Sequence, residues 1–94
     1  MSLAPARRRA ILNYLAALSS HAANGDILHD VLNGMGIQSS ADQVGAELAW
    51  LAEAELVSVT EGSGFVLAEI TGRGVDVAGG SAAHPGVAPR KPRA

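Results

Sequence analysis

The clearest structural signal lies in residues 40–60, which read SADQVGAELAWLAEAELVSVT. Ser40 followed three residues later by Gln43 is the pattern of a capping box, so a helix should begin directly after Ser40. Apolar residues then recur at spacings of three and four, which predicts one buried stripe. The stripe comprises Ala41, Val44, Leu48, Leu51 and Ala52. The helix should close near Glu53, and from Leu56 the apolar period changes to the period of two that is typical of a strand.

A β hairpin should follow this helix. Residues 56–60 and 65–70 have the composition of strands, and the glycine-containing turn at residues 61–64 joins them. Thr71 can cap a short last helix over residues 72–78, although two glycines weaken its helical propensity.

Two helices should precede residue 40. The first should begin near Pro5, which suits a first helical turn because its missing N–H would have no helical partner. It should end near Ser20, and a loop at residues 21–25 should follow. Asn24 can cap the second helix, which Gly34 and Gly36 end. The expected apolar face of that helix is Ile27, Leu28, Val31 and Leu32.

This order of elements predicts a fold that is mainly α with a small β hairpin. It corresponds to a winged helix-turn-helix with three helices, a two-stranded wing and a short C-terminal helix. The expected divisions are an N-terminal arm at residues 1–5, a winged-helix domain at residues 6–78 and a tail at residues 79–94. The tail is basic and rich in Gly, Pro and Ala, and we expect it to be flexible because it can bury little apolar surface.

Composition narrows the possible classes of protein. The 94 residues correspond to one domain, and an aromatic content of 3% implies an aliphatic core. The absence of cysteine excludes a disulfide scaffold, a thiolate zinc site and a cysteine nucleophile. No apolar run approaches the roughly 20 residues that cross a bilayer.

The N-terminal 25 residues could also be a secretory signal, because a basic triplet at residues 7–9 precedes an apolar stretch. Asn13 interrupts that stretch, and its apolar residues recur at helical spacing, so we favour a structural helix. The lack of cysteine agrees with a cytoplasmic protein, which is the expected localisation.

Charge is distributed unevenly along the chain. The net charge is −2, yet each end carries three basic residues, at 7–9 and at 90–93. The segment between the ends holds all nine acidic residues and a single base, Arg73. Such a pattern indicates basic arms attached to an acidic body.

Several short motifs together resemble a known family. They are ELAWL at residues 47–51, LV at 56–57, TGRG at 71–74 and PGV at 85–87, combined with the basic C-terminal end. This combination resembles small winged-helix proteins of Mu-like phages and prophages, over most of residues 7–90. The resemblance implies a phage-encoded transcriptional regulator that acts in the host cytoplasm.

Duplex DNA is therefore one expected partner. The helix after Ser40 contains no Lys or Arg, so cationic contacts to phosphates must come from other elements. The expected DNA-binding residues are Arg7, Arg8, Arg9, Ser39, Ser40, Gln43, Arg73, Arg90, Lys91 and Arg93. A homodimer would read two half-sites about 34–36 Å apart.

The acidic helix supports an alternative, in which the same fold is a protein-interaction or dimerisation module. Its expected interface residues are Glu47, Trp50 and Glu53, which would dock on a basic protein partner or on a second copy. Trp50 could instead pack beneath the first helix or the wing. His21, His29 and His84 lack the spacing of metal ligands. We expect no enzymatic activity, cofactor, metal, small-molecule substrate or membrane partner.

Overall fold

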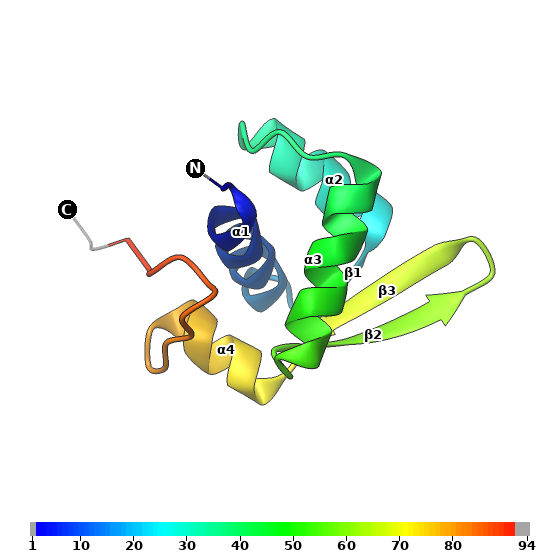
Figure 1. The fold of residues 1–94 in the computed structure, drawn as a ribbon. Helices are drawn as coiled ribbons and strands as arrows, with labels where there is room; N and C mark the ends of the chain where they lie inside the picture. Colours follow the sequence, from blue (N-terminus) through cyan, green and yellow to red (C-terminus); the bar gives the residue numbers. More distant parts are fainter. Residues whose placement is uncertain (1, 92–94) are drawn as a thin grey trace.

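The computed structural model describes residues 2–91 and shows an α+β domain (Figure 1). Within these residues four helices pack with one antiparallel sheet, whose strand order is β1-β3-β2. The elements in chain order are α1 (Ala4–Ala17), β1 (Ala22–Asn24), α2 (Gly25–Gly34), α3 (Ala41–Glu53), β2 (Val57–Gly62), β3 (Phe65–Ile70) and α4 (Gly72–Gly79).

Three helices begin at the caps that the sequence predicts. The Ser40 hydroxyl accepts the N–H of Gln43, and the Gln43 side chain accepts the N–H of Ser40, which completes the capping box of α3. Asn24 caps α2 through the N–H of Ile27. Thr71 caps α4 in the same way. The starts of these helices are therefore determined by local sequence.

The sheet has one strand more than the expected two-stranded wing. β1 lies where a loop was predicted, and it pairs with β3 from Ala22 opposite Glu69 to Asn24 opposite Leu67. The β2–β3 hairpin is confirmed, whereas the prediction of only two strands is wrong for a physical reason. β1 is only three residues long and contains no β-branched or aromatic residue, so it forms because β3 offers a backbone edge and not because of its own propensity.

The core lies between the helices and the inner face of the sheet. Its largest fully buried side chains are Ile11, Leu12, Leu15, Leu28, Leu32, Leu51, Leu56, Val44 and Val77. Four members of the expected apolar stripes lie outside this core, and two of them, Val31 and Ala52, are half-buried. Ala41 is exposed in the first turn of α3, and Ile27 is exposed in the first turn of α2. Helical spacing thus predicts the side of each helix that faces the core, but the first turns are exposed and the edges of the face are only half-buried.

The chain after α4 returns to α1. Val87 is buried, and the N–H of Ala88 donates to the carbonyl oxygen of Pro5 at 3.1 Å. The carbonyl oxygens of Gly86 and Ala88 also accept hydrogen bonds from Arg8 and Arg9, so residues 86–88 contact α1 in several places. The expectation that residues 79–94 form a flexible tail stays a prediction, and its last three residues, 92–94, lie outside the described residues.

Glu55 occupies a position that favours glycine. The N–H groups of Glu55 and Leu56 donate to the carbonyl oxygens of Ala52 and Leu51, which is a Schellman motif. The motif holds Glu55 at a φ of 63°. The matching position after α2 is Gly36, at a φ of 83°.

We therefore expect Glu55→Gly to raise the free energy of unfolding by about 0.5–1 kcal/mol, because a side chain in the left-handed region is strained. Gly36→Ala should lower it by a similar amount, since a methyl group there meets no atom within 4 Å and only the φ angle opposes it. Urea denaturation midpoints at constant m measure both changes. A Glu55→Gly midpoint at or below that of the parent chain would refute the strain.

Candidate functional site

The three consecutive arginines of α1 point to three different parts of the domain. Successive residues on an α-helix are rotated by about 100°, so Arg7, Arg8 and Arg9 spread around more than half of the helix. Each guanidinium group hydrogen-bonds to a segment distant in sequence. The basic triplet therefore connects α1 to α3, to α4 and to the C-terminal segment.

Arg7 is buried at the junction of α2 and α3. Its Nε donates to the Ser39 hydroxyl at 2.8 Å, and its Nη2 donates to the carbonyl oxygen of Gln38 at 3.0 Å. Its Nη1 lies 3.4 Å from Oε2 of Glu47, and both side chains are more than 90% buried. A buried cation needs charge compensation, and Glu47 supplies it for Arg7.

Arg8 binds the other oxygen of the same carboxylate. Its Nε lies 2.7 Å from Oε1 of Glu47, and its Nη1 donates to the carbonyl oxygen of Gly86. Its guanidinium carbon lies 3.8 Å from the ring centroid of Trp50, a cation–π contact. His84 packs edge-on against the same ring. Trp50 is thus half-buried against Arg8 of α1 and against His84. This is the expected alternative in which Trp50 packs beneath the first helix.

Arg9 extends to the end of α4. Its Nη1 donates to the carbonyl oxygens of Val77 and Ala78, and its Nε donates to that of Ala88. Cationic donors at a helix C-terminus satisfy carbonyl groups that lack a helical partner. Burial, and then the charge of Arg90, lowers the pKa of Arg9. Arg9, whose charge would oppose the dipole of α1, therefore stabilises the C-terminus of α4.

Most polar atoms of the expected DNA-reading residues are engaged within the domain. Ser39 is buried and binds Arg7, while Ser40 and Gln43 bind one another in the capping box. Glu47 is buried, which corrects the expectation that it forms an intermolecular interface. Glu53 is exposed at the end of α3.

The remaining expected cations lie elsewhere. Arg73 is exposed in the first turn of α4. Arg90 donates to the carbonyl oxygen of Gly79, and Lys91 is exposed. Arg93 lies outside the described residues. The structure thus brings Arg7 and Arg8 together with Glu47, and it leaves Arg73 and Lys91 exposed.

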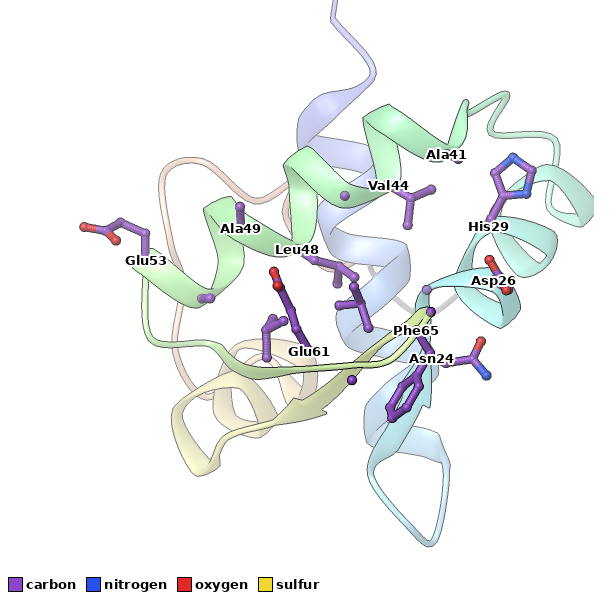
Figure 2. A pocket seen from close by; sticks show the side chains of 17 residues that line it. Asn24, Asp26, His29, Ala41, Val44, Leu48, Ala49, Glu53, Glu61 and Phe65 are labelled. Atoms are coloured by element: carbon purple, nitrogen blue, oxygen red, sulfur yellow. The ribbon is translucent and has the colours of Figure 1, made fainter.

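A groove of about 920 Å³ lies between α3 and the β2–β3 hairpin, with the start of α2 at one end (Figure 2). Along α3 it is lined by Ala41, Val44, Gly45, Leu48, Ala49, Ala52 and Glu53. The hairpin contributes Val59 and Val66, which lie on the sheet face that is turned toward α3. The groove therefore has an apolar floor composed largely of small side chains.

Carboxylates surround this floor. Glu61 points from β2 toward α3, whereas the ring of Phe65 points to the opposite side of the hairpin (Figure 2). Asp26 lines the groove at the start of α2, and Glu53 lines it at the end of α3. Among the described residues that line the groove there is no Lys or Arg, and His29 is the one group that could become cationic. The groove consequently presents negative charge around an apolar surface.

Sequence reasoning did not identify the network that holds α1 to the turn before α3. The Asn33 side chain bridges this turn, since it donates to the carbonyl oxygen of Ser39 and accepts the N–H of Ser39. One feature of the sequence could have indicated that Glu47 pairs with a cation. This residue falls between Val44 and Leu48 on the buried side of α3, where a carboxylate requires a cationic partner.

Within residues 2–91, no helix has both the length and the apolar character needed to span a membrane. In the same part of the chain, no three His, Asp or Glu side chains are grouped closely enough to hold a metal ion.

Comparison with known proteins identifies a phage relative. No protein-family model matches the chain. No solved structure matches it. The chain is 42% identical over 88 residues to a protein of Escherichia phage Mu described as "Uncharacterized protein gp26". The alignment covers 94% of this chain and 91% of the phage protein, which supports a phage origin. The chain therefore belongs to the family of the phage Mu protein gp26.

Proposed function

We propose that this protein is a protein-interaction module of the winged-helix type, whose groove between α3 and the hairpin binds a basic, partly apolar segment of a partner protein. The distribution of charge carries the proposal. All three arginines of α1 donate to groups inside the domain, whereas the groove presents Asp26, Glu53 and Glu61.

The arrangement of elements supports the winged-helix part of the proposal. α2 and α3 are joined by a short turn, and the β2–β3 hairpin follows α3 directly. In a DNA-binding winged helix, the second helix of the helix-turn-helix lies in the major groove. Here the corresponding surface contains the acidic groove. Since duplex DNA is held mainly through its phosphates, carboxylates at this position disfavour it.

The groove also has the anatomy of a protein-binding surface. A small apolar floor inside a charged rim is typical of sites that anchor a few side chains of a partner and orient them by charge. Val59 and Val66 are only partly buried, and Ala49 is exposed. Covering them with apolar groups of a partner would remove that surface from water.

The proposal is tested by NMR on the ¹⁵N-labelled protein at low salt. The probes are a short peptide of alternating Arg and Leu, the same peptide with Glu in place of Arg, and a random DNA duplex. We expect the basic peptide to shift the amide signals of Ala49, Glu53 and Glu61, while the acidic peptide and the duplex leave them unchanged.

Charge-reversal variants provide the control. Glu61→Lys should weaken binding of the basic peptide about tenfold, because an attraction becomes a repulsion. Glu69→Lys changes the same net charge on the opposite face of the hairpin, where the residue is exposed, and should bind like the parent chain. Duplex binding that shifts the groove signals, or equal weakening by both variants, would refute the proposal.

A further inference from the structure

We infer that the occupant of the groove is the basic C-terminal segment of a second copy of this chain, residues 89–94 (PRKPRA). This inference rests on the proposed function, because it uses the same groove as the binding site. It adds the identity of the partner, and it makes the protein an assembly of copies joined head to tail.

Charge complementarity is the first argument. Glu53 and Glu61 have no ion-pair partner among the described residues. Lys91 is exposed and likewise has no ion-pair partner in that part of the chain. Arg93 follows two residues later in the sequence. Two cations of the segment can therefore meet two carboxylates of the groove at a surface where neither charge loses an internal partner.

Shape is the second argument. The groove follows α3 from Ala41 to Glu53, and a helix of 13 residues is about 20 Å long. Two prolines favour a polyproline II conformation, in which six residues span about 19 Å. Small residues of α3, Ala41, Gly45, Ala49 and Ala52, leave room for proline rings against the helix. Pro-rich segments bind shallow apolar grooves in this way.

The direction of the chain is the third argument. The described chain after α4 runs along α1 and α4, and it ends at residue 91 on the side opposite the hairpin (Figure 1). The contact of Ala88 with Pro5 holds the start of the segment on that side. A second copy can therefore present its groove to this segment, provided that Arg90 gives up its hydrogen bond to the carbonyl oxygen of Gly79. Because the contact joins two different surfaces, it is heterologous and produces a ring or an open chain of copies.

A charge-swap experiment on the full chain tests the inference by sedimentation equilibrium. The groove variant is Glu53→Lys with Glu61→Lys, and the segment variant is Lys91→Glu with Arg93→Glu. We expect the parent chain to self-associate at about 0.01 M salt, and its dissociation constant to rise at least tenfold at about 1 M salt, where the Debye length falls to roughly 3 Å. Each variant alone should be monomeric. The chain carrying all four substitutions should self-associate again, since its groove is basic and its segment acidic.

Mixing the two variants gives an independent readout. The basic segment of the groove variant fits the acidic groove of the segment variant, and the acidic segment of the second fits the basic groove of the first, so assemblies that contain the two variants in equal numbers should form. Glu69→Lys should associate like the parent chain. A monomeric parent chain at low salt, or a fourfold variant that stays monomeric, would overturn the inference. If the Arg–Leu peptide still shifts the groove signals in that case, the proposed function stands and only the second copy is excluded as occupant.

Discussion

Glu47→Ala is expected to lower the free energy of unfolding by about 3–5 kcal/mol, the effect of removing one partner from a buried ion pair. The substitution leaves Arg7 with the Ser39 hydroxyl and the Gln38 carbonyl oxygen, but without a negative charge. It also removes the 2.7 Å contact of Arg8. Small domains have total stabilities of about 5–15 kcal/mol, so this change alone removes a large part of the total. Urea denaturation measures the loss as a shift in midpoint.

Glu53→Ala is the matched control, because Glu53 lies on the same helix and is exposed. It should change stability by no more than about 0.5 kcal/mol. Salt distinguishes the two positions further. Buried pairs are screened much less than exposed ones, so the loss caused by Glu47→Ala should persist at about 1 M salt. Similar midpoints for the two variants would show that Glu47 does not compensate the arginines of α1.

The helix starts and the hairpin were predictable because their causes are local. A capping box requires only Ser40 and Gln43, and the hairpin requires two short apolar runs joined by a glycine turn. β1 was not predictable in this way. Its pairing with β3 depends on a backbone edge that comes more than 40 residues later in the chain, and its own residues carry no strand preference.

The functional residues were harder to predict because the charge of a side chain does not indicate which group it pairs with in the folded protein. Three adjacent arginines at the start of a chain suggest a phosphate-binding arm, and no local feature indicates that Glu47 and the carbonyl groups of α4 receive them. Only part of the groove could be predicted from the sequence. The exposed outer face of α3 follows from helical spacing, but the inward orientation of Glu61 depends on the pairing of β2 with β3. Buried polar partners thus require the tertiary structure.

The second large effect is expected at Gly74, where α4 packs closely against the backbone of Leu56. Gly74 is buried in α4, where a Cβ atom would overlap the carbonyl oxygen of Leu56 and lie 2.7 Å from Cγ1 of Ile70. The Leu56 carbonyl cannot retreat freely, since it accepts the N–H of Thr71 at 3.1 Å. We expect Gly74→Ala to lower the free energy of unfolding by about 3 kcal/mol, the upper part of the range for overpacking, because the obstructing atom belongs to the backbone.

Gly72→Ala separates this effect from helix propensity. Gly72 lies two residues earlier in the same helix, and a methyl group there meets no atom within 4 Å. Replacing it should stabilise α4 by up to about 1 kcal/mol, because alanine is the better helix former and restricts the unfolded chain. In a domain of this size, the two variants should differ in Tm by at least about 12 °C. Nearly equal Tm values would mean that α4 can shift away from Leu56, and that the contact between these segments is not fixed by Gly74.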